Sequence, residues 1–388
     1  MLRKFMYMTL LLSIVAVGQA DICGSDFGSR AKTSLKQAGN NRSEISKALH
    51  LVPRKQREGM EFLVAFMPIV DLQSLSAEFL LQHVEYAYRA WQEAAWTDSI
   101  SNDIFLNNIL PYSNITETRE SWRKDFYDRF HAIVKDAQTP GEAAVKLNQE
   151  IFKLTNVKYS TARKRPDQSP SETIDSGLAS CSGLSVLLID ACRSVGVPAR
   201  FVGTPMWSNQ SGNHSWVEIW NGGWHFTGAC EPAGDELDRG WFLGRASQAD
   251  RNSQLHAIFA VSYRPTKQRF PLGWAPEKDW VWAVNVTDRY TRLKEELPAG
   301  MGRVMFSAVD KDGARLSAAI EIRNSAGKMV YQGTTNDIRF DTNDHLNIKV
   351  MLHEQYEILV RHASRTIRRN VKFEKAGDLT LFEFNTNR

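Results

Sequence analysis

The segment from Cys181 to Val195 constrains the fold most, because it is apolar on nearly all sides. A helix without a polar face is stable only inside a protein core. Gly196 suits the position just past the end of such a helix, and Pro198 prevents the helix from continuing. Residues 199–203 then have the pattern of a strand. The sequence therefore predicts a buried helix that leads directly into a sheet.

Cys181 falls in the first turn of this predicted helix. The unpaired N–H groups and the dipole of a helix N-terminus favour an anion, so we expect a lowered thiol pKa and an activated nucleophile. The same N–H groups could hold an oxyanion. The alternative is a buried structural cysteine, which fits Cys192 in the middle of the helix. Position alone leaves both readings open for Cys181.

A predicted hairpin carries the second reactive side chain. Residues 213–220 alternate as a strand, with His214 near its start, and Asn221-Gly222 is a strong turn signal before a second strand. An imidazole beside a thiol at a helix start is what a Cys–His enzyme needs, because the imidazole takes the thiol proton and later protonates the leaving amine. The pair of Cys181 and His214 therefore favours catalysis over a structural histidine.

Together these motifs resemble the transglutaminase-like superfamily, a papain-like cysteine enzyme fold. The resemblance rests on C-S-G-L-S at 181–185, G-V-P-A-R at 196–200 and G-N-H-S-W-V-E-I-W at 212–220, and it covers about residues 140–245. It implies Cys181 as nucleophile and His214 as base, without a cofactor or a metal. Within the superfamily, the chain resembles secreted bacterial proteins with additional domains.

The third catalytic position departs from the family pattern. The family has an Asp four residues after the hairpin tryptophan, and this chain has Gly228 there. Glu231 is the nearest acid downstream. A two-residue hairpin loop would place Glu231 on the face of His214, whereas a three-residue loop would turn it away unless a bulge restored it. We predict Glu231 as the third member; two further acids are weaker alternatives, Asp235 and Asp238.

An oxyanion hole needs a donor besides the backbone of Cys181. Gln168 lies upstream of the nucleophile, where papain-like enzymes have a side-chain donor, and we predict this role for it. The alternative is an ordinary loop glutamine.

The predicted fold class is α+β, with a papain-like transglutaminase core between two other parts. We expect a helical N-terminal region at 21–139, the catalytic core at 140–296, and a β-sandwich at 303–388, either Ig-like or carboxypeptidase-regulatory-like. Six short β-rich runs separated by turn residues predict the sandwich. A late basic cluster is expected on a solvated face; it comprises Arg361, Arg365, Arg368 and Arg369.

Residues 1–20 have the pattern of a secretory signal peptide. Arg3 and Lys4 form a charged start, residues 8–17 form an apolar run, and small residues follow. The run is shorter than the roughly 20 residues that span a bilayer. We therefore expect cleavage, no integral membrane segment in the mature chain, and a secreted or periplasmic location. A net charge of +4 over 388 residues gives no support for nucleic-acid binding.

These features predict a secreted thiol enzyme that acts on amide bonds through a thioester acyl-enzyme. Hydrolysis, as in a peptidase or amidase, is favoured over transfer to an amine. The expected substrate is a protein, a peptide or a glycopeptide. The alternative is a surface binding or adhesion module on a catalytically degenerate core. Gly228 and the sandwich favour that alternative, whereas the intact Cys181 and His214 oppose it.

Overall fold

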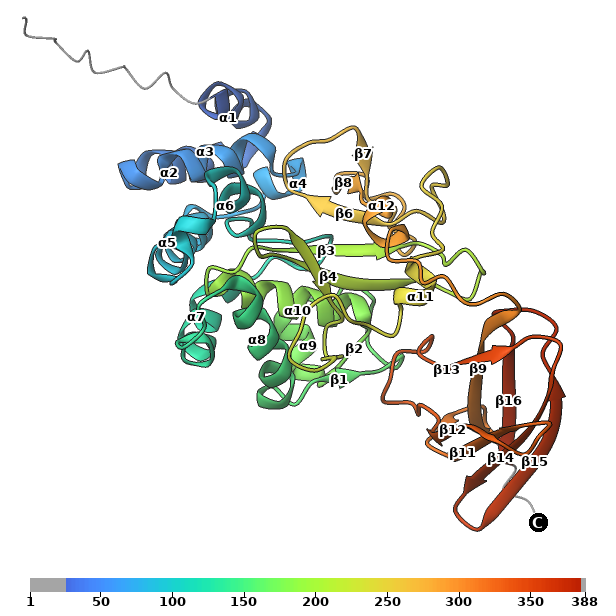
Figure 1. Ribbon diagram of the computed structural model, residues 1–388. Coiled ribbons are helices and arrows are strands. Elements are labelled where there is room, and N and C mark those ends of the chain that lie inside the picture. The colour runs from blue at the N-terminus through green and yellow to red at the C-terminus, as the bar shows by residue number, and fades with distance from the viewer. Residues whose placement is uncertain (1–25, 385–388) are drawn as a thin grey trace, which may run out of the picture.

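The computed structural model describes residues 26–384, so the predicted signal peptide and Cys23 lie outside the described residues. Helices gather at the N-terminal side, a six-stranded sheet lies in the middle, and a two-sheet sandwich follows at the C-terminal side (Figure 1). This arrangement confirms the predicted α+β class. Within residues 26–384 we find no helix that is both long and apolar enough to cross a membrane.

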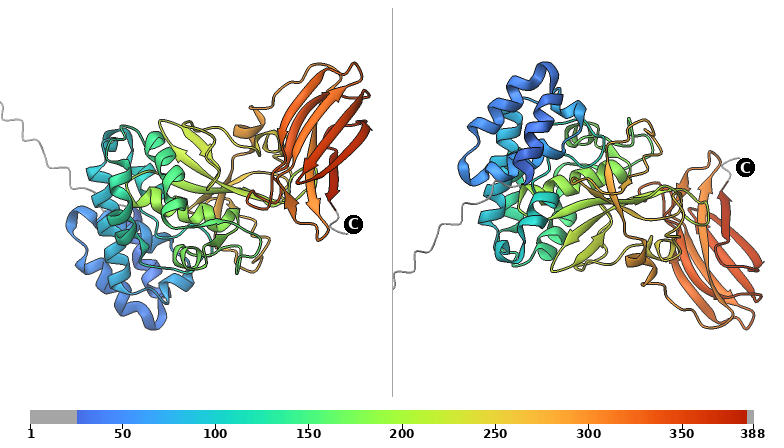
Figure 2. Two further views of the ribbon diagram at one scale, coloured as in Figure 1. Left: turned by 90° about the horizontal axis from the view of Figure 1, so that it is seen from below. Right: turned by 90° about the horizontal axis from the view of Figure 1, so that it is seen from above.

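The N-terminal part is a stack of helices that shares one apolar core with the central sheet. Its helices are α1 (Asp26–Gln37), α2 (Arg42–Leu51), α3 (Arg57–Phe66), α4 (Ile69–Leu72), α5 (Ala77–Glu93), α6 (Asn102–Asn108), α7 (Trp122–Val134) and α8 (Pro140–Leu154). Local sequence explains the start of α8, because Thr139 caps the N–H of Glu142 and Pro140 fits the first turn. Seen from below and from above, these helices lie on one side of the six-stranded sheet and the sandwich lies on the other (Figure 2).

Helix α10 (Cys181–Ser194) is the buried helix that the apolar run predicts. Every residue after Cys181 in this helix is buried, so the prediction is confirmed. Short elements precede it: β1 (Lys158–Tyr159), α9 (Pro170–Ser176) and β2 (Leu178–Ala179). Gly196 follows with φ +79°, and a Cβ there would lie 2.5 Å from the carbonyl oxygen of Ala90. A glycine is therefore needed where the end of α10 meets α5.

The central sheet is antiparallel, with the strand order β5-β4-β3-β6-β8-β7. Its strands are β3 (Ala199–Thr204), β4 (His214–Trp220), β5 (Trp224–Thr227), β6 (Phe259–Ser262), β7 (Gln268–Arg269) and β8 (Trp282–Asn285). Strand β4 is buried on both faces. Val217 and Ile219 join the core that contains α10, whereas Trp216 joins a second cluster with α11 (Leu243–Ala246) and α12 (Thr287–Thr291).

The C-terminal sandwich has two four-stranded sheets around its own apolar core. One sheet has the order β10-β9-β13 with β16 parallel to β9, and the other has the order β12-β11-β14-β15. The strands are β9 (Met301–Asp310), β10 (Arg315–Leu316), β11 (Ala319–Asn324), β12 (Met329–Thr334), β13 (Leu346–Met351), β14 (Gln355–His362), β15 (Arg365–Lys372) and β16 (Leu379–Phe384). The basic cluster lies on β14 and β15. The sequence did not predict the edge strand β15, because arginines interrupt the apolar alternation that marks a strand.

The connection between β12 and β13 reaches back from the sandwich to the central part. We call residues 335–345 the sandwich loop. The loops at this end of the sandwich lie near β1 and β2 (Figure 1). The Tyr159 hydroxyl in β1 lies 2.8 Å from Oγ1 of Thr342, which fixes the contact.

Candidate functional site

The site lies where the N-terminus of α10 meets the start of β4. Cys181 is the first residue of the helix and His214 the first residue of the strand. The neighbouring hydroxyls of Ser182 and Ser215 hydrogen bond at 3.1 Å, which links helix and strand directly behind the pair. Sγ of Cys181, a ring nitrogen of His214 and a carboxylate oxygen of Asp341 lie within 4.8 Å of one another. The structure thus brings the two sequence-predicted residues together and adds a third.

His214 is buried in a box of aromatic rings. Its ring centroid lies 4.8 Å from that of Trp241 and 5.0 Å from that of Phe242, and two more tryptophans lie about the same imidazole, Trp207 and Trp216. Within the described chain, neither ring nitrogen of His214 has a hydrogen-bond partner, although a carboxylate faces each of them. Such walls hold the imidazole in place and leave its nitrogens available for proton transfer.

Glu231 faces Nε2 of His214, with its Oε2 at 3.9 Å. The hairpin has the three-residue loop, because Trp220 pairs with Trp224, and continued pairing would have turned Glu231 away. The ladder instead stops at Thr227, and a turn follows in which Cys230 has φ +65°. This turn redirects the chain toward His214.

Gly228 makes the space that the Glu231 carboxylate occupies. A Cβ at residue 228 would lie 2.4 Å from Oε2 of Glu231 and 3.1 Å from its Cβ. The same Oε2 accepts a hydrogen bond from Nε1 of Trp241 at 2.9 Å. A side chain at 228 and the present position of Glu231 therefore exclude each other, which explains how an acid at 231 can accompany a glycine at the family's aspartate position.

Asp341 comes from the sandwich loop, and no sequence motif marked it as a site residue. Its Oδ2 lies 3.5 Å from Nδ1 of His214, and only 2% of the residue is exposed. Local pattern offers no signal for this placement, because the residue lies in a turn of a region expected to be a separate sandwich. Only the docking of that loop on the core reveals it.

The charges of the site differ from the expectation for a helix start. Burial, followed by the negative charge of Asp341, raises the pKa of the Cys181 thiol, and backbone hydrogen bonds at Ser215 and Ser182 only partly oppose this. The expected lowering of the thiol pKa is therefore wrong for this arrangement, because desolvation and a nearby carboxylate outweigh the backbone hydrogen bonds that favour the thiolate.

The two carboxyl groups around His214 shift in opposite directions. Burial and the charge of Asp341 raise the pKa of Glu231 well above its usual range. Burial also acts to raise the pKa of Asp341, but its interaction with the His214 ring 3.5 Å away and the hydrogen bonds from Asn343 outweigh burial, so the net shift is downward. Asp341 is thus the more acidic of the two carboxyl groups that face the imidazole.

Gln168 is fully buried and its amide is engaged within its own segment. Its Nε2 donates to the carbonyl oxygens of Glu172 and Leu178 at 3.2 and 3.0 Å and lies 3.3 Å from the hydroxyl of Ser176. Its Oε1 accepts from the N–H of Lys164 at 3.1 Å. An oxyanion donor role would require this amide to leave those partners. In this arrangement Gln168 joins the loop before α9 to the strand that precedes Cys181.

The weaker acid candidates have partners elsewhere. Asp238 lies 2.6 Å from Nδ1 of His225, and Asp235 accepts a hydrogen bond from Gln149 at 2.8 Å. Among the described residues, the acids placed at the ring nitrogens of His214 are thus Glu231 and Asp341.

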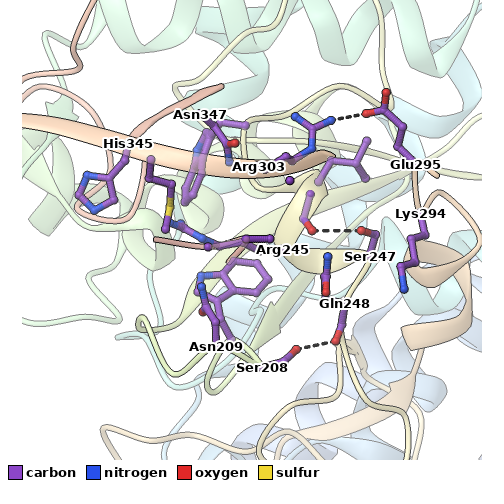
Figure 3. Close-up of a pocket in the computed structure, with 18 of the residues that line it drawn as sticks. Ser208, Asn209, Arg245, Ser247, Gln248, Lys294, Glu295, Arg303, His345 and Asn347 are labelled. Atoms are coloured by element: carbon purple, nitrogen blue, oxygen red, sulfur yellow. Dashed lines mark hydrogen bonds and ion pairs between the residues drawn. The ribbon is translucent and has the colours of Figure 1, made fainter. Parts of the chain in front are cut away.

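A cavity of about 750 Å³ lies beside the site, between the central part and the sandwich. Trp207 and Trp241 line it and also belong to the box around His214. Arg245, Arg303 and His345 are among its lining residues (Figure 3).

The cluster of thiol, imidazole and carboxylate also has the donor types of a zinc site. Cys181, His214 and Asp341 could together hold one ion only with the thiol deprotonated, so binding of an ion would release the thiol proton. The predicted thiol chemistry requires no metal.

Comparisons with known proteins place this geometry in a family. Residues 128–229 match the model of the transglutaminase-like superfamily. A candidate cysteine protease of Cytophaga hutchinsonii is 24% identical with a TM-score of 0.24, over 30% of this chain and 39% of that one. Red sea bream transglutaminase is 9% identical with a TM-score of 0.32, over 72% and 65%. The Bacillus anthracis TIE protein is 11% identical with a TM-score of 0.19, over 49% and 30%.

The chain spans less than two thirds of the length of each of these solved chains. The comparison with curated proteins gave no match. The family model covers α10, β3, β4 and β5, and with them both Cys181 and His214. The chain therefore carries a domain of the transglutaminase-like superfamily at residues 128–229.

Proposed function

We propose that the chain is a thiol enzyme that cleaves amide bonds, with Cys181 as nucleophile and His214 as base. The observation that carries the proposal is the approach of Sγ of Cys181 to the imidazole of His214, in a domain of the transglutaminase-like superfamily. A thiol at a helix start and a buried imidazole on the adjacent strand suit acyl transfer. Glu231 supports the proposal as a positioning residue at the second ring nitrogen.

The reaction proceeds in two acyl transfers. His214 takes the proton of the Cys181 thiol, and the sulfur attacks the amide carbonyl. The tetrahedral intermediate collapses, the C–N bond breaks, and the imidazolium protonates the leaving amine. The resulting thioester passes its acyl group to water, whose proton returns through His214. The products are a carboxylic acid and an amine, and the thiol is restored.

Water is the proposed acceptor, so the chain acts as a peptidase or amidase rather than as a crosslinking transferase. The proposed substrate is a protein, a peptide or a glycopeptide. The signal-like pattern of residues 1–20 supports export to the periplasm or the exterior, where such substrates are available.

A mass-spectrometric screen tests the proposal. The chain without residues 1–20 is incubated with a peptide pool, a glycopeptide pool and an amine donor, in parallel with Cys181→Ala. Hydrolysis adds the mass of water across the cleaved bond, whereas transfer adds the amine in place of the leaving group. We expect the water products only with the unmodified protein. Equal product formation by Cys181→Ala would contradict the proposal.

The second candidate is a binding module on an inactive core. The raised pKa of the Cys181 thiol favours it, because a neutral thiol is a weak nucleophile. A binding module would retain its peptide ligand in the Cys181→Ala variant and yield no cleaved product with either protein. The same screen therefore separates the two candidates.

A further inference from the structure

The sandwich loop, residues 335–345, crosses the Cys181–His214 pair and is attached on both sides of it. On the side of β1, the N–H of Thr342 donates to the hydroxyl of Tyr159 at 2.9 Å, and the Oγ1 of Thr342 lies 2.8 Å from the same hydroxyl. On the side of β4, Nδ2 of Asn343 donates to the carbonyl oxygen of Asn213 at 3.1 Å. The loop thus bridges the walls that a substrate would have to enter between.

The fit on the β4 side is close. Arg245 donates to the carbonyl oxygen of Asn343 at 2.5 Å. A Cβ at Gly212 would lie 2.7 Å from Oδ1 of Asn343, at a φ of +120°. The sequence before His214 thus admits Asn343 only because residue 212 has no side chain.

Hydrogen bonds within the sandwich fix the conformation of the sandwich loop. Arg315, within the sandwich, donates to the carbonyl oxygens of Phe340, Asp341 and Asp344. The N–H of Asn343 donates to Oδ1 of Asp341 at 2.9 Å. These bonds leave Oδ2 of Asp341 to face the imidazole.

Asp341 lies on the thiol side of the imidazole and not behind it. In a catalytic triad, the thiol hydrogen bonds one ring nitrogen of the histidine and the orienting acid hydrogen bonds the other. When two groups each hydrogen bond a different ring nitrogen at about 2.9 Å, the bonding atoms of those two groups lie well over 5 Å apart. Sγ of Cys181 and the Asp341 oxygen lie within 4.8 Å of each other, with Oδ2 at Nδ1. Glu231 takes the opposite nitrogen, Nε2. Asp341 therefore competes with the thiol for its base.

We propose that the sandwich loop is an autoinhibitory latch, with the Asp341 carboxylate standing where the carboxylate product of hydrolysis would leave. The inference rests on the proposed function of Cys181 and His214. In the closed position the loop blocks the acyl substrate. Its Asp341 carboxylate faces the imidazole of His214, and the charge of that carboxylate raises the pKa of the Cys181 thiol. Opening removes all three restraints together. A cavity of about 750 Å³ lies beside the loop and is lined in part by Asn336, Asp344 and His345, so the loop has open space next to it.

The test measures alkylation of Cys181 by iodoacetamide at pH 7, mapped by mass spectrometry in the full chain without residues 1–20. Tyr159→Phe removes both contacts with Thr342 and leaves the charge of Asp341 in place. Asp341→Asn removes the charge itself. We expect each variant to raise the rate roughly tenfold, the equivalent of one lost hydrogen bond. Asp312→Asn is the matched control, because that aspartate is exposed and pairs with the neighbouring Lys311, and it should leave the rate unchanged.

Buried Cys192 serves as an internal control for folding and should stay unlabelled in every variant. An unchanged rate in Tyr159→Phe would overturn the latch, even if Asp341→Asn reacts faster, since charge alone would then explain the effect. A fall in peptide cleavage by Asp341→Asn would also overturn it and would make Asp341 a positioning residue. Faster alkylation in both variants without any cleavage of peptides would support the latch and reject the proposed amide chemistry.

Discussion

Replacing Gly228 by Ala should destabilise the protein through its effect on one carboxyl group. The new Cβ would lie 2.4 Å from Oε2 of Glu231, so the carboxyl must move. Moving it breaks the 2.9 Å hydrogen bond from Trp241 and leaves a half-buried indole N–H without its partner. A lost hydrogen bond with an unsatisfied donor costs about 1–3 kcal/mol. The φ of Gly228 is not positive, so an alanine adds no backbone strain there.

A double-mutant cycle isolates this contact. We expect urea unfolding to give a loss of about 2 kcal/mol for Gly228→Ala in the natural background. In the Glu231→Ala background the same change should cost less than about 1 kcal/mol, since only the Cβ contact at 3.1 Å remains. The coupling free energy should thus be at least about 1 kcal/mol. Additive losses within about 0.3 kcal/mol would refute the reasoning that residue 228 and the Glu231 carboxyl compete for one space.

Three further predictions concern stability. Gln168→Ala should lower the free energy of unfolding by about 2–4 kcal/mol, because it removes the hydrogen bonds of a fully buried amide and leaves a cavity in its place, whereas a surface glutamine would change it by less than about 0.5 kcal/mol. Gly196→Ala should cost at least about 2 kcal/mol in urea unfolding, from its positive φ and the collision with Ala90; a neutral result would contradict the close approach. Burial raises the pKa of Asp344 to about 7, so the folded state binds the proton more tightly and stability should fall by about 3 kcal/mol as the pH rises from 4 to 7. Asp344→Asn should flatten that part of the pH profile, and an unchanged slope would assign it to other groups.

Local pattern was sufficient wherever neighbours in sequence are neighbours in space. The apolar run after Cys181 predicted α10, and the alternation around His214 predicted β4. Both elements are built from short-range periodicity and end signals. The resemblance to the transglutaminase-like superfamily, and not the periodicity, implied that the thiol and the imidazole meet. Periodicity did not predict the charged strand β15, because its residues from Arg365 to Lys372 show almost no apolar alternation.

The sequence left open whether Glu231 lies on the same face as His214. The residue type and its distance from His214 along the chain suggested a partner, but the register of the hairpin alone would have turned it away. The left-handed conformation of Cys230 and the missing side chain of Gly228 decided the outcome. Turn conformation depends on the packing around it, and sequence alone left the alternatives open.

The sequence by itself determined the α+β class, the helix that begins at Cys181 and the strand that begins at His214, because these depend on periodicity within single elements. The resemblance to the transglutaminase-like superfamily implied that the two residues pair. Only the tertiary structure revealed Asp341, because its approach to the imidazole requires the sandwich to dock on the core. The same docking reversed the expected shift of the thiol pKa. Burial and a carboxylate from a distant segment act through space, and no local pattern records the distance between segments that meet only after folding.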